Sequence, residues 1–122
     1  MDKLNDIFAK QKQLMRKYDL SICSDVFTFE HELINDPAYQ VRLRQIVQFT
    51  IEELCEATHL LKNKPWRKLK TKTNVELFYE ELADVLHFYV ELCATCGITA
   101  EKLYKLYTKK AAVNAVRQDG DY

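Results

Sequence analysis

The chain contains little glycine and little proline, with two of each among its 122 residues. These residue types mark turns, and a sheet of several strands needs many turns, so their scarcity argues against a sheet. A few long helices need few such residues. The composition therefore predicts an all-α fold, and the length predicts a single domain covering residues 1–122.

The chain also lacks a net charge and a long apolar run. Its 18 basic residues balance 18 acidic ones, which argues against direct nucleic-acid binding and against a membrane-surface protein. No stretch reaches the roughly 18 consecutive apolar residues that suggest a membrane span. The segment Met1–Asp6 has no signal-peptide core, so we expect a cytoplasmic protein.

The four cysteines do not form a pattern typical of a metal or redox centre. Cys93 and Cys96 make a CxxC motif, but the second close pair that a zinc site normally has is missing. Cys55 lies within an acidic segment, where we expect a small buried thiol. We therefore expect reduced cysteines without a zinc or redox role.

Helix start and stop signals divide the chain. Cap residues are Asp2, Asp36 before Pro37, Thr73 with Glu76 three residues on, and Thr99, and Gly97 is a stop signal. They predict helices over about 2–18, 37–62, 74–96 and 100–117. Residues 19–35 are predicted to be a connection that contains a short helix.

Helical periodicity predicts which faces form the core. The expected core stripe of the second helix is Leu43, Ile46, Val47, Leu54, Ala57 and Leu61; that of the third is Val75, Phe78, Leu82, Val85, Leu86, Tyr89 and Cys93. The third helix is apolar around most of its circumference, so it needs cover on more than one side. We expect a bundle of four to five helices that oligomerisation completes.

Two pairs of acids stand out within these helices. Glu53 and Glu56 on the second, and Glu81 and Asp84 on the third, are each three residues apart, so each pair projects from one helix face. All four border apolar residues, whereas Glu52, Glu80 and Glu91 are expected to face outward. They are either ordinary acids at the wet edge of an amphipathic helix or a cluster that requires a cation.

A hard divalent cation is the natural partner of four carboxylates. Mg²⁺ in particular binds a few carboxylates together with water and substrate phosphates, and metal-assisted attack on a phosphate is the chemistry indicated. Two groups of cationic and polar residues suit such a substrate: Lys64 and Trp66 in the loop after the second helix, and Lys110, Asn114 and Arg117 on one face of the last. Each group is alternatively a solvated surface.

These segments together resemble a known family. The ordered set is Glu52-Glu53-x-x-Glu56, Lys64-Pro65-Trp66-Arg67, Glu81-x-x-Asp84-x-x-His87-Phe88 and Lys110-x-x-x-Asn114-x-x-Arg117-Gln118. It resembles the all-α nucleoside triphosphate pyrophosphohydrolases, the dimeric dUTPases first and the MazG-type enzymes next. The first helix is also similar to the opening segment of dimeric dUTPases.

The resemblance implies a Mg²⁺-dependent enzyme, with Mn²⁺ as a possible substitute, that cleaves a deoxynucleoside triphosphate into the monophosphate and pyrophosphate. It implies that Glu53, Glu56, Glu81 and Asp84 bind the metal and that Glu53 or Glu56 orients the attacking water. Lys110, Asn114 and Arg117 would hold phosphates and nucleoside, with Lys64, Trp66 and Gln11 also in the substrate site. Members of the family form homodimers or homotetramers.

The base preference and the competing functions remain open at this point. The tail reads Asp119-Gly120-Asp121-Tyr122 where the family tends to have glycine directly before tyrosine. We expect dUTP as substrate, with dCTP, a purine or a damaged nucleotide as alternatives. A hydrolase of another phosphate ester and a non-enzymatic helical adaptor are the other functions to be separated.

Overall fold

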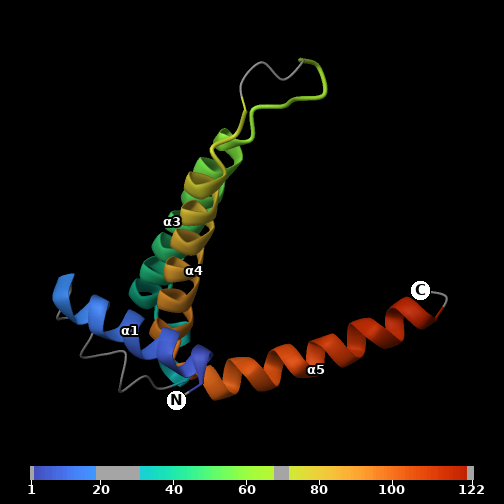
Figure 1. Cartoon of the computed structure of the whole chain (residues 1–122). Helices are drawn as coiled ribbons and strands as arrows, with labels where there is room; N and C mark the ends of the chain where they lie inside the picture. Colours follow the sequence, from blue (N-terminus) through green and yellow to red (C-terminus); the bar gives the residue numbers. More distant parts are fainter. Residues whose placement is uncertain (1, 19–30, 68–71, 121–122) are drawn as a thin grey trace. The chain divides into compact units, whose positions relative to one another are not determined.

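The computed structural model describes residues 2–18, 31–67 and 72–120 (Figure 1). Its elements are α1 (Lys3–Tyr18), the 3-10 helix η1 (His31–Asn35), α3 (Pro37–Leu60), α4 (Val75–Thr95) and α5 (Ala100–Asp119). Within these residues, β-structure is limited to an isolated bridge between Lys64 and Arg67. The prediction of an all-α fold is confirmed.

Local hydrogen bonds explain where most of the helices begin. Each of three predicted caps accepts a hydrogen bond from the backbone N–H three residues on: Asp2 at 2.9 Å, Asp36 at 3.0 Å and Thr99 at 3.1 Å. Such caps satisfy backbone donors that the first helical turn leaves unpaired. The predicted starts of α1, α3 and α5 are therefore confirmed.

The end of α4 depends on a glycine in the left-handed region. Gly97 has a φ of 77°, its N–H donates to the Ala94 carbonyl at 3.0 Å, and the Ile98 N–H donates to the Cys93 carbonyl at 2.9 Å. This is the Schellman arrangement, in which glycine avoids the steric penalty of a positive φ. The predicted stop signal at Gly97 is confirmed.

The predicted start of the third helix is wrong by one residue. Asn74 Oδ1, rather than the Thr73 hydroxyl, accepts the capping hydrogen bond, which the Leu77 N–H donates at 3.1 Å. Asparagine caps a helix at least as well as threonine, and a start at Val75 places Asn74 at the capping position.

The chain divides into two compact units. One comprises residues 30–92 and the other residues 1–29 and 93–122. In the first unit α3 and α4 lie side by side and antiparallel (Figure 1), with the rings of Phe49 and Phe88 5.7 Å apart, and η1 packs on α3. In the second unit α1 packs against α5.

A narrow seam joins α3 to α4. Its positions are buried or half-buried and alternate in steps of four and three: Ile46, Thr50, Glu53, Ala57 and Leu60 on α3, and Phe78, Glu81, Val85, Phe88 and Leu92 on α4. Such spacing keeps one stripe of each helix against its partner, as in a coiled coil. Glu53 and Glu81 occupy seam positions, so the fold itself brings these two carboxylates together.

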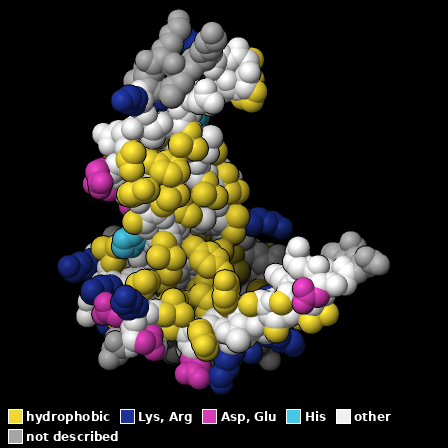
Figure 2. Space-filling view, turned by 45° about the vertical axis from the view of Figure 1, so that its right-hand side comes forward, with side chains coloured by type: hydrophobic (Ala, Val, Ile, Leu, Met, Phe, Trp, Pro, Cys, Tyr) yellow, Lys and Arg dark blue, Asp and Glu magenta, His cyan; other side chains and the backbone are white. Residues whose placement is uncertain are grey.

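The predicted core stripes are only partly correct. Ile46 and Ala57 are buried, but a second set of apolar side chains is exposed: Val47 and Leu54 on α3, Leu61 directly after it, and Val75, Leu82, Leu86 and Tyr89 on α4. Figure 2 shows hydrophobic side chains gathered along this hairpin. One pair of helices has one seam, so a second apolar stripe has no partner within it.

Two further expectations concern cysteine and membranes. Cys55 is exposed rather than buried, because its position on α3 is turned away from the seam, whereas Cys93 is buried. Cys55 and Cys96 are free thiols. Taken singly, none of the described helices is long and apolar enough to cross a membrane; α4 and α5 pass such a test of length and composition only as a pair.

Candidate metal site

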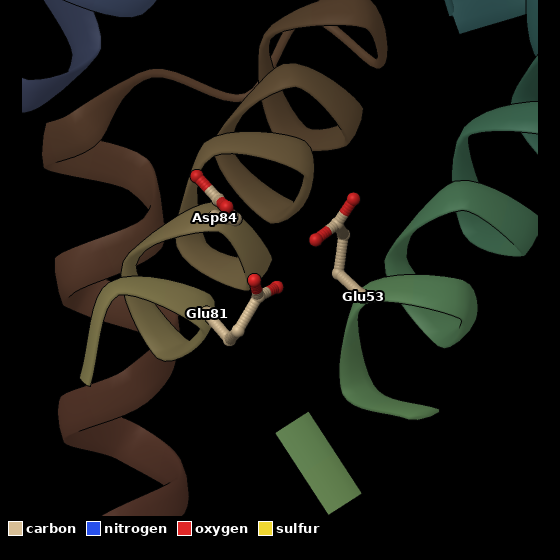
Figure 3. Close-up of side chains that lie close together, drawn as sticks. All are labelled: Glu53, Glu81 and Asp84. Atoms are coloured by element: carbon tan, nitrogen blue, oxygen red, sulfur yellow. The ribbon is translucent and has the colours of Figure 1, made fainter. Parts of the chain in front are cut away.

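Three of the four predicted acids meet at the middle of the hairpin. Glu53 on α3 and Glu81 and Asp84 on α4 each contribute a carboxylate oxygen, and these oxygens lie within 4.8 Å of one another. Figure 3 shows Glu53 pointing across the gap toward the two acids of α4. The seam positions Glu53 opposite Glu81, and one further turn of α4 supplies Asp84.

The unpaired oxygens of this cluster fit a cation. The Oε2 atoms of Glu53 and Glu81 are both buried, and no N–H or hydroxyl group in the described part of the chain donates to either. A buried carboxylate oxygen without a hydrogen-bond donor is costly. Such oxygens are the ligands that hard divalent cations prefer. The three acids are therefore suited to hold Mg²⁺ or Mn²⁺.

The pKa of Glu53 reflects the crowding of these acids. Burial, the negative charge of Glu56 and the adjacent Glu81 carboxyl group together raise it from 4.5 to about 7, with burial as the largest cause. The pKa of Glu81 is also raised, chiefly by burial. Both shifts have the sign expected when like charges are brought together out of water, and a bound cation would oppose them.

Glu56 lies at the edge of this cluster. It is exposed and is not among the three residues whose oxygens converge. Its charge nevertheless acts on both Glu53 and Glu81, because it lies one turn after Glu53 on the same helix. Glu56 is thus close enough to interact with the cluster while remaining accessible to water and ligands.

The predicted basic loop forms a tight turn after α3. The Arg67 N–H donates to the Lys64 carbonyl at 3.1 Å, with Pro65 at the second position, where its fixed φ suits a β-turn. Lys64 Nζ lies 5.6 Å from the centre of the Trp66 ring, a cation–π contact. A hollow of about 440 Å³ is lined by residues 63–67, and Trp66 is 78% exposed.

The remaining predicted substrate residues belong to the other unit. Lys110, Asn114 and Arg117 lie on α5 and are all exposed, and their spacing of four and three residues places them on one face of that helix. Gln11, on α1, is only 3% exposed. A buried amide has few routes to a ligand, so Gln11 is the predicted residue whose environment is most typical of a structural role.

An ion pair elsewhere on the α3–α4 hairpin was not expected from the sequence. Glu91, predicted to face outward, is 2% exposed, and its Oε1 lies 4.0 Å from Arg42 Nη2. The sequence around Glu91 gives no signal for this pair, because its partner lies on another helix.

About half of the chain is similar in sequence to a known enzyme. A dCTP pyrophosphatase from Enterobacteria phage LZ5 is 34% identical to this chain over 71 residues, covering 48% of this chain and 41% of the relative. The chain thus spans less than half the length of the relative it matches. No family model matches the chain, and no solved structure matches it. The similarity relates about half of this chain to a nucleoside triphosphate pyrophosphatase.

Proposed function

We propose that this chain is a Mg²⁺-dependent pyrophosphohydrolase of deoxynucleoside triphosphates, which releases the nucleoside monophosphate and pyrophosphate. The observation that carries the proposal is the convergence of Glu53, Glu81 and Asp84, with two buried oxygens that no donor among the described residues satisfies. The partial similarity to a dCTP pyrophosphatase supports the same reaction class.

In this proposal Glu53, Glu81 and Asp84 hold the cation, and Glu56 completes the acidic group from its edge. A bound Mg²⁺ would offset the negative charge of the triphosphate and lower the pKa of a bound water toward neutral pH. Mn²⁺, which also accepts carboxylate oxygens, is expected to substitute. The role of this chain is to keep the carboxylates in place before the substrate arrives.

Glu56 is the better placed of the two proposed catalytic acids to orient water. It is exposed, whereas Glu53 is part of the converging group. As general base it would accept a proton from the attacking water while the bond between the α and β phosphates breaks and pyrophosphate leaves. Glu53 would then act mainly as a ligand.

The cationic and amide groups are proposed to bind the rest of the nucleotide. Lys110 and Arg117 would contact phosphates, with Asn114 between them for a phosphate or the nucleoside. Trp66 is largely exposed, so a base could stack on its ring, and Lys64 beside it would add a cation. Gln11 is retained as a candidate base contact, although its burial favours a structural role.

Two pyrimidine nucleotides are the first substrates to compare. The motif resemblance favours dUTP, whereas the relative bears the name of a dCTP pyrophosphatase. The two bases differ at one exocyclic position, a carbonyl acceptor in uracil and an amino donor in cytosine. A site that hydrogen-bonds this position discriminates strongly between them.

A second copy of this chain is proposed to cover the exposed stripe of the hairpin. Leu82 and Leu86, both 43% exposed, lie one turn apart on α4, and Val47 and Leu54 continue the stripe on α3. Two hairpins that pack through such stripes would form a four-helix arrangement and bury both. The oligomer is expected to be a homodimer or homotetramer.

The test is a panel of the four common dNTPs and dUTP, each incubated with and without Mg²⁺, with ³¹P NMR of the products. The proposal predicts pyrophosphate and a monophosphate in the presence of Mg²⁺ only. Reaction in ¹⁸O-labelled water would show which phosphorus receives the new oxygen. Release of orthophosphate would indicate another phosphate-ester hydrolase, and the absence of any product with all five nucleotides would favour an adaptor.

A further inference from the structure

The ion pair between Arg42 and Glu91 has unusual surroundings for two charges. The Glu91 side chain is 3% exposed and that of Arg42 is 27% exposed, with 4.0 Å between Nη2 and Oε1. Compared with well-packed apolar side chains, a buried ion pair often contributes no net stability, because removing both charges from water offsets their attraction. The best-attested role of such a pair is to select one arrangement of the helices over others.

The apolar part of the seam selects that arrangement only weakly. Its residues recur every three or four positions, so a slide of α4 by one turn, about 5.4 Å, still places an apolar residue against α3. Val85 would then lie opposite Glu53 in place of Glu81.

The acidic cluster itself acts against the observed register. Glu53, Glu81 and Asp84 have oxygens within 4.8 Å of one another, and ionised carboxylates at such distances repel. Without a cation, a one-turn slide would relieve that repulsion. An attractive contact elsewhere along the hairpin would oppose this repulsion and favour the register in which the three acids converge.

Arg42 and Glu91 lie where such a contact is effective. Arg42 precedes Glu53 by three turns of α3 and Glu91 follows Asp84 by two turns of α4, so the ion pair and the cluster belong to the same antiparallel register. The Phe49–Phe88 contact lies between them. A slide that separates the acids would also move Arg42 away from the buried Glu91 carboxylate, which is unfavourable.

We propose that Arg42 and Glu91 are positioning residues, whose ion pair fixes α3 against α4 so that Glu53 lies opposite Glu81 and Asp84. This inference rests on the proposed function, because its consequence is a metal site assembled before the metal binds. The pair touches neither metal nor substrate. It determines the fraction of molecules in which the site is formed.

The test compares three variants with the wild-type protein. R42M/E91L replaces the pair by apolar side chains, and R42E/E91R exchanges the two charges. The matched control is D6N/K10Q, which removes the exposed ion pair between Lys10 Nζ and Asp6 Oδ2, 2.8 Å apart. Binding of Mn²⁺ alone is measured by electron paramagnetic resonance of the free ion. Circular dichroism and thermal unfolding report whether each variant folds.

We expect R42M/E91L to remain helical and to bind Mn²⁺ about tenfold more weakly, as when about one molecule in ten has the competent register. Saturating metal should restore its kcat, since the metal selects that register. R42E/E91R and D6N/K10Q should bind Mn²⁺ within about twofold to threefold of wild type, the range usual for changes that leave a site intact.

Two results would overturn the inference. One is wild-type Mn²⁺ affinity in folded R42M/E91L. The other is a folded R42E/E91R variant that binds Mn²⁺ about tenfold more weakly than wild type, as expected for loss of the pair. If R42M/E91L does not fold, the Mn²⁺ affinity of R42E/E91R decides the question. A wild-type protein that binds no Mn²⁺ would instead refute the metal site of the proposed function. The failures of the two proposals are thereby distinguishable.

Discussion

The raised pKa of Glu53 makes a quantitative prediction about metal binding. Burial, the charge of Glu56 and the adjacent Glu81 carboxyl group raise this pKa to about 7. A divalent cation binds the carboxylate and not the carboxylic acid, so the proton must leave as the metal arrives. Metal affinity should therefore increase with pH across the neutral range.

The size of the effect follows from the fraction of Glu53 that is protonated. At pH 6, one unit below a pKa of about 7, about nine tenths of the carboxyls carry a proton, and at pH 8 about one tenth do. The apparent dissociation constant for Mg²⁺ should thus be about tenfold larger at pH 6 than at pH 8. The raised pKa of Glu81 acts in the same direction and makes the dependence steeper.

The same shift fixes the sign of the stability change without metal. Because the folded-state pKa of Glu53 lies above its ordinary value of 4.5, proton binding stabilises the fold fully below about pH 4.5, and this contribution is lost as pH rises through about 7. Without metal, Tm should fall between pH 5 and pH 8. Added Mg²⁺ should raise Tm more at pH 8 than at pH 6.

Isothermal titration calorimetry with Mg²⁺ at pH 6, 7 and 8, in two buffers of different ionisation enthalpy, measures both affinity and proton release. Wild type should release close to one proton at pH 6 and few at pH 8. Glu53→Gln should bind more weakly and lose most of the pH dependence, whereas the exposed neighbour Glu52→Gln should behave as wild type. Equal wild-type affinity at pH 6 and pH 8, without proton release, would refute the reasoning.

Three other predictions address the reaction, the assembly and the fold. Asp84→Asn should lower kcat/KM for the preferred dNTP by at least about 100-fold through loss of a metal ligand, while helical circular dichroism is retained. The control is Glu80→Gln, at an exposed position next to Glu81, and full activity of Asp84→Asn would show the site to be misassigned. Leu86→Glu should shift the oligomer toward monomer in sedimentation velocity, because it places a charge in the apolar stripe; an unchanged sedimentation coefficient would argue against that interface. Asn74→Ala should lower the free energy of unfolding, measured by urea denaturation, by about 1 kcal/mol, and Thr73→Ala should lower it clearly less. The reverse order would show that Thr73 caps α4.

Features that depend on neighbouring residues in the chain could be predicted from the sequence. The caps at Asp36 and Thr99 and the stop at Gly97 involve partners within a few residues, so their chemistry is visible in a short window. The choice between Thr73 and Asn74 was missed because both residues cap well and differ by one position.

Features that depend on a partner helix could be predicted only in part. The i,i+3 spacing identified Glu53, Glu81 and Asp84 as candidates, since each pair shares one face of its own helix. The width of the seam was not predictable, because apolar residues beside it, such as Leu82, look the same in the sequence whether a second copy or the same chain covers them. Glu91 was missed because its partner, Arg42, lies on another helix.

A crystal structure of the protein soaked in Mn²⁺, with anomalous diffraction recorded near the manganese edge, tests the central claim most directly. The account predicts an anomalous peak bounded by the carboxylates of Glu53, Glu81 and Asp84. Manganese only at other positions, or carboxylates of α3 and α4 that share no ion at saturating Mn²⁺, would contradict it.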